Sequence, residues 1–544
     1  MPNAADVANR IAIAAKSIKV LADAGIVAPM KPQTMVKAIG ATVRWGSTPA
    51  AGYTASAARR PGNTAIVDEL GSLTFSEVHE RTNALANELN NQGIGAGDNV
   101  AVLARNHRGF IDATVAISKI GANALYLNTM FASPQIAEVC EREKPVALVY
   151  DEEFTELIEE GGRNLKRFVA WHDAEESRSG DPTLDSLIAR GSTADLKAPA
   201  DPGRVVILTS GTTGTPKGAN RQQPKSMLPV AGLFDKIPLK SEQRVLISAP
   251  MFHSWGFAHF TFGLALGSTL YLHRRFDPDQ MLQTIQDQRC QVLAVVPVML
   301  QRALELPEEA FSGRDLSSLE VIAVSGSALP GPLATEVMDR MGDVLYNLYG
   351  STEVAWATIA TPEDLRAAPG TAGRPPMGTV IKLFDDDGNE VPHGETGRIF
   401  VGNELQFEGY TGGGHKAFID GLMSSGDVGH IDEGGRLFID GRDDEMIVSG
   451  GENVFPREVE DAISHIEGVD EVAVIGVEDD QFGQRLRAFV VAQETAQVSE
   501  DHVRAHVKAN LASYKVPRDV IFIEELPRNA TGKILKRVLV DHDS

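Results

Sequence analysis

The feature that most constrains the fold is a repeated alternation of short apolar runs with helix-like stretches. The runs NVAVLAR (99–105), ANALYLN (122–128) and PVALVYD (145–151) are typical of strands, and FIDATVAISKIG (110–121) is typical of a helix between the first two. This alternation favours βαβ units, in which parallel strands are connected by helices. It therefore predicts a parallel sheet in this part of the chain.

The same alternation returns in the middle of the chain. RVLISAP (244–250), QVLAVVP (291–297) and LEVIAVSG (319–326) are strand-like, and DPDQMLQTIQDQR (277–289) has the pattern of a helix. A second group of βαβ units follows from this pattern. We therefore expect an α/β fold with a large N-terminal domain built from parallel sheets.

The character of the sequence changes twice towards the C-terminus. From about residue 378, short strand-like pieces alternate with Gly- and Asp-rich turns, as in 385–402, which predicts a small β-rich subdomain. After Asp443 and Asp444, about 100 residues carry an α+β pattern that suits a small separate domain. We therefore expect an N-terminal extension (1–50), a large domain (51–443) and a small C-terminal domain (444–544).

The N-terminal extension is basic and amphipathic. Its first 50 residues hold six Lys or Arg against two Asp, a net of +4, whereas the whole chain carries −23. An apolar stripe at helical spacing is formed by Val7, Ile11, Ala14, Ile18 and Leu21. The stripe predicts a helix that packs on the protein's own body, with contact to a membrane surface as the alternative.

Composition excludes several classes of protein. The 544 residues are 43% hydrophobic and 23% charged, which is ordinary for a globular chain, and the negative charge argues against a nucleic-acid partner. Cys140 and Cys290 form neither a disulfide framework nor a metal-ligand pattern. With no apolar run of about 18 residues and no signal-peptide pattern, we expect a cytoplasmic protein, as a monomer or a homodimer.

The stretch TSGTTGTPKG (209–218) directly follows the apolar run VVILTS (205–210). Its glycines allow backbone N–H groups to approach an anion closely, its hydroxyls can line the same site, and Lys217 adds a positive charge. The stretch therefore suits the polyphosphate of a nucleotide, with a plain surface loop as the alternative. It is not a Walker loop, because Gly218 stands where a magnesium-binding hydroxyl would follow the lysine.

Further motifs follow this loop along the chain. They are MFHSWG (251–256), SGSALP (325–330), NLYGSTE (347–353), SSGDVG (424–429), GRDDEMIVSGGENVFPREVE (441–460), YKVP (514–517) and PRNATGKILKR (527–537). In this order they resemble the adenylate-forming enzymes, which include acyl-CoA synthetases, peptide-synthetase adenylation domains and luciferases. The resemblance covers about residues 50 to 544, and the chain looks most like bacterial medium- and long-chain fatty-acid–CoA ligases.

The resemblance implies a reaction in two halves. A carboxylate attacks the α-phosphate of ATP and releases pyrophosphate, and the thiol of coenzyme A then attacks the acyl-adenylate and releases AMP. Lys533 matches the catalytic lysine, which stabilises charge between the carboxylate and the α-phosphate, and Thr352 matches a contact to that phosphate. His253 matches a gate between the nucleotide site and the acyl pocket; by itself it would be a core histidine.

The resemblance also implies the nucleotide site. Tyr349 would stack on the adenine, Asp427 would bind the ribose hydroxyls, and Arg442 would reach the sugar or the phosphates. For Asp427, the alternative to ribose binding is a purely structural role in an Asx turn. The full set implied for ATP and coenzyme A is Thr209, Ser210, Gly211, Thr212, Thr213, Lys217, Gly326, Ser327, Ala328, Asn347, Tyr349, Gly350, Ser351, Asp427, Arg442, Gly450 and Gly451.

Magnesium and a domain movement are further implications of the resemblance. Glu353 and the hydroxyl of Thr209 match the Mg²⁺ ligands, which suits a cation that prefers oxygen and phosphate ligands. Asp444 matches the hinge of a mobile C-terminal domain, and Gly450 and Gly451 would let the pantetheine thiol pass the backbone. The run Gly412–Gly414 departs from the family pattern, so that its role stays open.

The acid is inferred from the segment around His253. Amino-acid-activating relatives have Phe-Asp where this chain has Phe252-His253, so a free amino acid is disfavoured. The apolar stretch SWGFAHFTFGLALG (254–267) favours a medium- or long-chain fatty acid, and an aryl or other carboxylic acid is the alternative. No carrier domain follows the last motif, so we expect free coenzyme A as acceptor. A catalytically idle nucleotide-binding homologue and a hydrolytic phosphate-loop ATPase are the alternatives from other classes.

Overall fold

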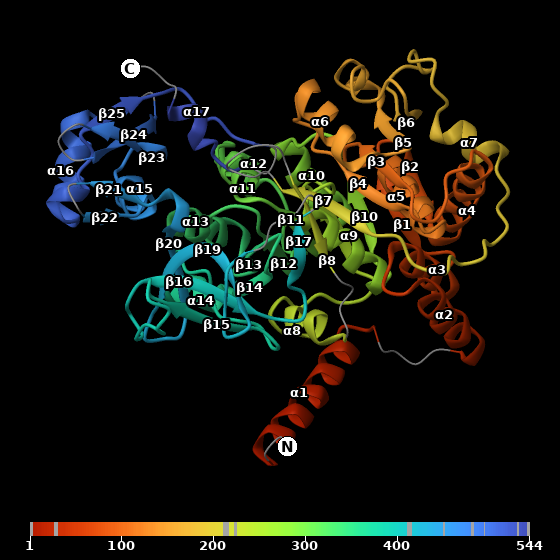
Figure 1. Cartoon of the computed structure of the whole chain (residues 1–544), viewed down its shortest axis with the longest axis horizontal. Coiled ribbons are helices and arrows are strands. Elements are labelled where there is room, and N and C mark those ends of the chain that lie inside the picture. Colours follow the sequence, from red (N-terminus) through yellow and green to blue (C-terminus); the bar gives the residue numbers. More distant parts are fainter. Residues whose placement is uncertain are drawn as a thin grey trace. The chain divides into compact units, whose positions relative to one another are not determined.

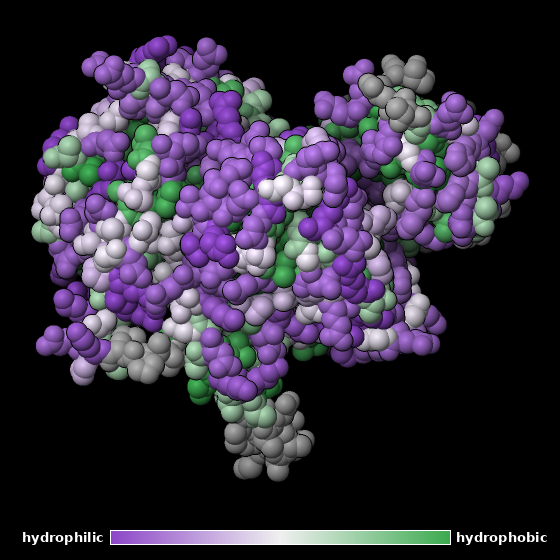
Figure 2. Space-filling model, turned by 180° about the vertical axis from the view of Figure 1, so that it is seen from behind, coloured by the Kyte–Doolittle hydropathy of each residue, from purple (hydrophilic) through white to green (hydrophobic). Residues whose placement is uncertain are grey.

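The computed structural model divides the chain into two compact units (Figure 1). The described residues are 4–26, 31–209, 217–221, 226–410, 416–449, 452–479, 483–493, 496–529 and 532–540. The first unit consists of Met1–Ser325, Arg340–Tyr346 and Glu404–His415, and the second of Gly326–Asp339, Asn347–Asn403 and Lys416–Ser544. The face of the molecule drawn in Figure 2 is mostly hydrophilic, in keeping with the charge content of the sequence.

One sheet of the first unit contains the strands predicted between residues 99 and 151. Its seven strands have the order β17-β8-β7-β4-β3-β5-β6 and are parallel from β7 to β6. The strands are β3 (Asn99–Leu103), β4 (Asn123–Tyr126), β5 (Ala147–Asp151), β6 (Lys166–Trp171), β7 (Val205–Thr209), β8 (Lys217–Arg221) and β17 (Phe407–Tyr410). The predicted strands and the helix between them, α5 (Arg108–Lys119), are confirmed.

A second sheet of this unit contains the next predicted group. In it β12 (Val321–Val324), β11 (Val292–Val295), β9 (Arg244–Ile247), β10 (Thr269–Leu272) and β1 (Thr64–Asp68) are parallel neighbours, and β2 (Gly71–Thr74) pairs antiparallel with β1. All four residues of β11 and of β12 are buried, as expected for strands covered on both faces. The predicted strands and the helix α10 (Pro278–Gln288) are therefore confirmed.

Helices complete the architecture. Besides α5 and α10, the described α-helices outside the C-terminal segment are α1 (Ala4–Asp23), α2 (Pro32–Trp45), α3 (Pro49–Arg59), α4 (Phe75–Asn91), α6 (Ser133–Glu143), α7 (Leu184–Arg190), α8 (Leu228–Lys236), α9 (Ser254–Leu266), α11 (Pro297–Leu304), α12 (Glu308–Ser312), α13 (Gly331–Met341) and α14 (Pro362–Ala367). Among the described residues, no helix is long and apolar enough to cross a membrane.

The predicted N-terminal helix is confirmed as α1, and its C-terminal end packs on α8 (Figure 1). Lys16 Nζ lies 2.6 Å from Asp235 Oδ2 of α8, and Leu21 and Ala24 are buried. The N–H of Ser241 also donates to the carbonyl of Ala24. This end of the helix therefore packs on the protein's own body, as the first interpretation of the sequence expects. The predicted stripe is only partly the packing face, because Ala14 is exposed and Ile18 is 65% exposed, whereas Leu21 is buried.

Antiparallel strands dominate the second unit up to residue 442, which confirms the predicted β-rich part. A hairpin is formed by β13 (Leu345–Ser351) and β14 (Ala355–Ala360), which pair from Asn347 onwards. A separate sheet has the order β15-β16-β19-β18, with β20 added beside β19. Its strands are β15 (Val380–Phe384), β16 (Gly397–Gly402), β18 (Phe418–Ile419), β19 (Leu422–Ile431) and β20 (Leu437–Arg442).

The C-terminal segment has a sheet and an apolar core of its own. The strands are β21 (Ile447–Ser449), β22 (Glu452–Val454), β23 (Val469–Asp479), β24 (Gly483–Ala492) and β25 (Asp519–Phe522), and the helices are α15 (Pro456–Ser464), α16 (Glu500–Asn510) and α17 (Lys536–Val540). The core includes Val459, Val474 and Val503, all fully buried. The predicted α+β pattern is confirmed, whereas the domain boundary at 443/444, within a 3-10 turn, stays a prediction.

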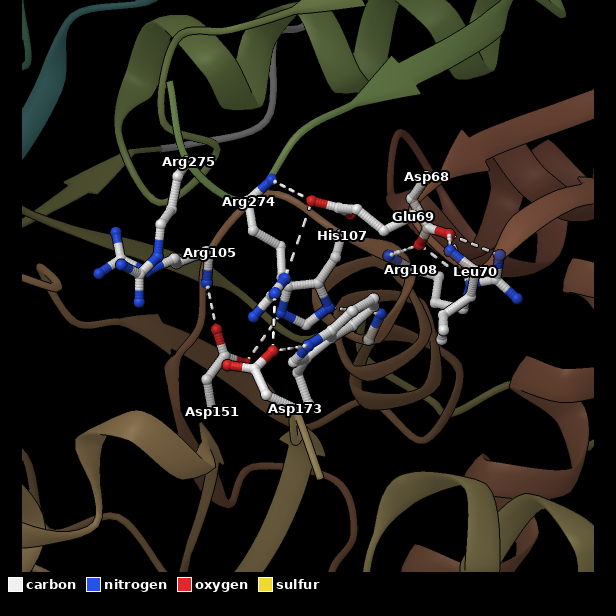
Figure 3. Close-up of polar contacts among 12 residues, drawn as sticks. Asp68, Glu69, Leu70, Arg105, His107, Arg108, Asp151, Asp173, Arg274 and Arg275 are labelled. Carbon is white, nitrogen blue, oxygen red and sulfur yellow. Dashed lines mark hydrogen bonds and ion pairs between the residues drawn. The ribbon is translucent and has the colours of Figure 1, made fainter. Parts of the chain in front are cut away.

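A buried ion pair joins the two sheets of the first unit (Figure 3). Asp68, at the end of β1, accepts hydrogen bonds from the backbone and the guanidinium of Arg108, the first residue of α5. Burial alone would raise the pKa of Asp68, but the hydrogen bonds from Arg108 hold that pKa below its ordinary value. The pair therefore fixes the end of a strand in one sheet to the helix that follows β3 in the other.

A second contact lies beside this pair. Asp151, at the end of β5, accepts hydrogen bonds from His107 Nε2 at 2.8 Å and from the backbone N–H of Arg105 at 2.8 Å. Arg274, just after β10, lies over the ring of Trp171 from β6 at 4.4 Å and forms an ion pair with Asp173. The end of β5 is therefore held by buried polar groups, whereas the ion pair of Arg274 with Asp173 is partly exposed, since the Asp173 side chain is 63% exposed.

We predict that Arg108→Ala destabilises the protein by about 3–5 kcal/mol, because it leaves the buried carboxylate of Asp68 without its partner. Urea unfolding of the first unit measures this effect. The control is Arg190→Ala, which removes a half-exposed ion pair with Glu88 and should cost no more than about 1 kcal/mol. Equal losses in the two variants would contradict the importance of the Asp68–Arg108 pair.

Candidate active site

The β13–β14 hairpin carries the NLYGSTE motif. Tyr349 lies in β13, and the tight connection to β14 contains Thr352 and Glu353, both half-buried. Ser351 Oγ accepts hydrogen bonds from the backbone N–H of Glu353 and of Val354, which closes the turn. Ala355 then has a φ of 61°, a left-handed conformation that costs a non-glycine residue about 1 kcal/mol. The strained turn holds Thr352 and Glu353 at one end of the strand.

Gly350 is required by the same hairpin. A Cβ atom at this position would lie 1.9 Å from the carbonyl oxygen of Ala355, so that any side chain would separate the two strands. The hairpin therefore explains structurally why a glycine occupies the predicted position 350. It allows the register shift that follows Tyr349 in the pairing of β13 with β14.

Asp427 lies at the centre of a polar cluster in the second unit. The hydroxyl of Tyr349 donates to Asp427 Oδ2 at 2.5 Å, and Arg442 Nη1 lies 3.5 Å from Asp427 Oδ1. Asp427 and Arg442 are paired residues of β19 and β20, and the Asp427 side chain is 12% exposed. The alternative of an Asx turn is wrong, because Asp427 lies within a strand.

Charge around Asp427 is balanced by cations. Burial raises the pKa of Asp427 above its ordinary value, and the hydrogen bond from Tyr349 and the charges of Arg442, Lys533 and Lys416 oppose this rise. Burial and the neighbouring carboxylate also raise the pKa of Tyr349, which keeps the phenol protonated as a donor. The structure therefore brings together four residues that the sequence analysis assigned: Tyr349, Asp427, Arg442 and Lys533.

Lys533 is half-buried in a short closed segment. Its backbone N–H donates to Asn529 Oδ1 at 2.9 Å, and its carbonyl accepts from the N–H of Asn529 at 2.9 Å. Arg528 ties the segment to β23 through an ion pair with Glu471 at 2.7 Å. These contacts fix the backbone from which the Lys533 side chain extends.

The remaining second-unit residues lie close to these in the chain. Asn347 is buried in β13, two residues before Tyr349. Gly326 has a φ of +100°, which a side chain would disfavour, and it forms a bend with Ser327 that Ala328 follows. Asp444 lies in the 3-10 turn Asp443–Glu445, and only the backbone of Asp444 is described. Gly450 and Gly451 lie outside the described residues.

The predicted phosphate loop connects two strands of the first unit. Thr209 ends β7 and Lys217 begins β8, and the two are paired in an antiparallel register. Their side chains, and Ser210, Gly211, Thr212 and Thr213 as a whole, lie outside the described residues, as does the run Gly412–Gly414.

His253 lies at the start of α9, where the chain leaves β9. Asn106 fixes this turn, because its amide donates to the carbonyls of Ile247 and Ala249 and accepts from the N–H of Met251. The Nε2 atom of His253 is buried and has no hydrogen-bond partner among the described residues, and burial lowers the pKa of His253 to about 4. At neutral pH the ring is therefore uncharged, in agreement with a gate and not with a cationic group.

The comparisons with known proteins decide the family. The profile of the AMP-binding enzyme family matches residues 53–411, and that of the AMP-binding enzyme C-terminal domain matches residues 458–533. The chain belongs to the AMP-binding enzyme family. The predicted resemblance to adenylate-forming enzymes is thereby confirmed.

Individual members of the AMP-binding enzyme family match along most of their length. Indoleacetate–CoA ligase of Aromatoleum aromaticum is 31% identical, over 88% of this chain and 94% of its own. Long-chain-fatty-acid–CoA ligase FadD13 of Mycobacterium tuberculosis is also 31% identical, over 86% and 92%. The structure of ATP-bound MatB from Rhodopseudomonas palustris matches with a TM-score of 0.79 at 28% identity, covering 88% of this chain and 95% of that one. The predicted fold class is confirmed by this match.

The sequence analysis did not identify every residue that surrounds the candidate site. The predicted residues have four further neighbours that shape their surroundings, namely Asn106, Trp255, His259 and Ala355. Trp255 Nε1 donates to the carbonyl of Ala323, and its ring lies edge-on against His259 at 4.6 Å. The position of Asn106 directly after a predicted strand was the one signal that could have identified it, since polar residues at strand ends often serve a site.

The residues present fit a magnesium ion that is bound together with a nucleotide. The described residues contain no cluster of three or more His, Cys, Asp or Glu side chains that could enclose a metal. Magnesium bound to nucleotides needs only one or two protein ligands, because phosphates and water supply the others. The single half-buried carboxylate of Glu353, on its strained turn, fits this requirement.

We predict that His259 makes the protein less stable in acid. Burial lowers the pKa of His259 to about 3 from the ordinary 6.5. Between these two pH values the unfolded chain binds more protons than the folded chain, so that the free energy of unfolding decreases as the pH is lowered. In His259→Phe, the loss of unfolding free energy between pH 7 and pH 5 should shrink by about 2 kcal/mol. Urea titrations at both pH values measure it.

His430 provides a control of opposite sign. A hydrogen bond with Asp440 raises the pKa of His430, so that the stability this pair adds is present at low pH and is lost as pH rises through the folded pKa. His430→Ala should therefore enlarge the acid loss. An unchanged pH dependence in His259→Phe would contradict the neutral buried state of His259.

Proposed function

We propose that the protein is an AMP-forming acid–thiol ligase, which activates a carboxylic acid with ATP and transfers the acyl group to coenzyme A. One observation supports this most directly. Lys533 lies near enough to the buried Asp427 to lower its pKa, and Asp427 is also bonded to Tyr349 and paired with Arg442. A lysine beside a polar cluster of this kind suits a reaction that brings two anions together.

Each residue of the cluster has a proposed role. The charge of Lys533 stabilises the transition state as the carboxylate oxygen attacks the α-phosphate, which Thr352 also contacts. Asp427 accepts the ribose hydroxyls and Arg442 binds the sugar or the phosphates. Tyr349 holds Asp427 and stacks on the adenine, whose other face and amino edge meet Gly326–Ala328 and Asn347.

The phosphate side has its own proposed residues. Glu353, with Thr209, would hold Mg²⁺, which would neutralise phosphate charge when bound. The loop from Ser210 to Lys217 would cover the departing pyrophosphate. Asp444 would be the hinge that exchanges Lys533 for Gly450 and Gly451 before thioester formation.

We propose a medium- or long-chain fatty acid as the substrate, on the basis of α9. Its side chains are apolar on nearly all sides, and the partly exposed stripe contains the small residues Ser254, Ala258 and Thr261 together with Phe257. Small residues beside a buried apolar helix leave room for an acyl chain. The name of the mycobacterial relative agrees with this choice.

An aryl acid is the second candidate. The ring of Phe257 lies 5.4 Å from that of Tyr126 and 5.8 Å from that of Phe260, so that a flat aromatic acid would also find ring contacts. The indoleacetate–CoA ligase relative agrees with this candidate.

Product analysis tests the proposed function. The protein is incubated with ATP, Mg²⁺, coenzyme A and acids from acetate to oleate, benzoate and indoleacetate, and AMP, ADP and pyrophosphate are measured. AMP and pyrophosphate formation that depends on the acid is expected. Acid-independent ADP would contradict the proposal in favour of an ATPase, and the absence of any product would favour an idle homologue.

We predict that Lys533→Ala lowers the rate of adenylation by about 10²–10³-fold, because a charge-stabilising group is lost from the transition state. Acid-dependent exchange of pyrophosphate into ATP measures this half-reaction. Thioester formation from supplied acyl-adenylate should fall much less. The matched control is Arg537→Ala, an exposed cation four residues away. Equal losses in both half-reactions would contradict the proposed role.

We predict that Ala258→Phe shifts the preference towards shorter acids. The added ring would fill the open stripe of α9, so that kcat/KM for the longest accepted acid falls by about 10-fold or more while that for a short acid changes little. The control is Ala367→Phe at an exposed position of α14. A parallel loss for all chain lengths would argue against an acyl site beside Ala258.

A further inference from the structure

Helix α2 exposes an apolar face to solvent. Met35, Val36, Ile39 and Val43 are 42%, 72%, 56% and 79% exposed, and their spacing places them on one side of the helix. The opposite side is firmly held, because Ala41 and Trp45 are buried with Ala50 and Ala51 of α3. Large apolar side chains gathered on one exposed helix face mark an interaction surface.

The segment that contains this face has no acidic residue. From Ala24 to Val67 the sequence includes neither Asp nor Glu, although the whole chain has 74 of them. Lys31, at the N-cap of α2, and Lys37 and Arg44, seven residues apart on one flank of the apolar face, are all exposed. The face is therefore a basic, apolar strip on a strongly acidic protein.

We propose that the exposed face of α2 binds the surface of an anionic membrane. Its apolar side chains would enter the boundary between headgroups and acyl chains, while Lys31, Lys37 and Arg44 contact lipid phosphates. A helix with one apolar face and flanking basic residues lies in the plane of such an interface. Anionic headgroups also attract each nearby Lys or Arg.

Charge argues against a second copy of this chain as the occupant. A symmetric dimer through α2 would place the same face of each subunit against the other. The three exposed cations would then meet like charges, with no acid between Ala24 and Val67 to neutralise them. A lipid surface supplies the negative charge that the face lacks.

Vesicle sedimentation of the full chain tests the proposal. Vesicles of phosphatidylcholine alone are compared with vesicles that also contain phosphatidylglycerol. The protein should partition onto the anionic vesicles and be released by salt. The variant Val36→Asp/Val43→Asp should lose about 10-fold or more in partition coefficient, because both apolar side chains are replaced by charges that the lipid phosphates repel.

Matched controls separate this face from other exposed apolar residues. Leu70→Asp/Met130→Asp changes two residues that are 59% and 60% exposed elsewhere in the first unit, and its binding should equal that of the wild type. Unchanged unfolding midpoints verify that both variants fold. Binding that survives Val36→Asp/Val43→Asp, or no binding to anionic vesicles at all, would overturn the proposal. Sedimentation velocity that shows a dimer abolished by this variant, without vesicle binding, would overturn it in favour of a second copy.

Discussion

The first unit depends on buried charge at the junction of its two sheets. Parallel strands bury both faces, so that the polar groups which join one sheet to another must be removed from water with them. Asp68 with Arg108 meets this requirement between the sheets, and Asp151 with His107 meets it within one sheet, because each carboxylate receives several hydrogen bonds. The ends of β1, β3 and β5 are thereby fixed. Asn106, between these pairs, extends the same fixed region to the turn before α9.

The candidate site in the second unit also contains a buried carboxylate with polar partners, but the pKa of this carboxylate is raised and not lowered. Asp427 is buried, but its partners are a phenol and cations that extend from separate elements, and burial still raises its pKa. Beside it, the β13–β14 hairpin keeps Ala355 in a strained conformation. In the proposed function, the hydroxyls of a ligand would complete the hydrogen bonds of Asp427.

The helices α1 and α2 each have one side that packs on the protein, and α2 also has an exposed apolar face. The end of α1 is attached to α8 by Lys16 and Asp235, and α2 is attached to α3 through Trp45. Packing within the protein does not explain why the outer face of α2 is apolar. If the substrate is a fatty acid, a protein that lies on a membrane would meet this acid where it is most concentrated, so that the proposed membrane contact and the proposed substrate support each other.

The sequence by itself determined the regular elements and the family. Apolar runs such as 99–105 and 291–297 could only be satisfied by buried parallel strands, and motifs such as NLYGSTE carried the resemblance along the whole chain. Tertiary structure alone decided the partners of individual side chains. The hydroxyl of Tyr349 on Asp427, the ring of Trp255 on His259 and the pairing of Asp68 with Arg108 join residues whose contact no local pattern indicates. Periodicity reports which face of an element is buried, whereas hydrogen bonds and pKa shifts depend on what the fold places opposite that face.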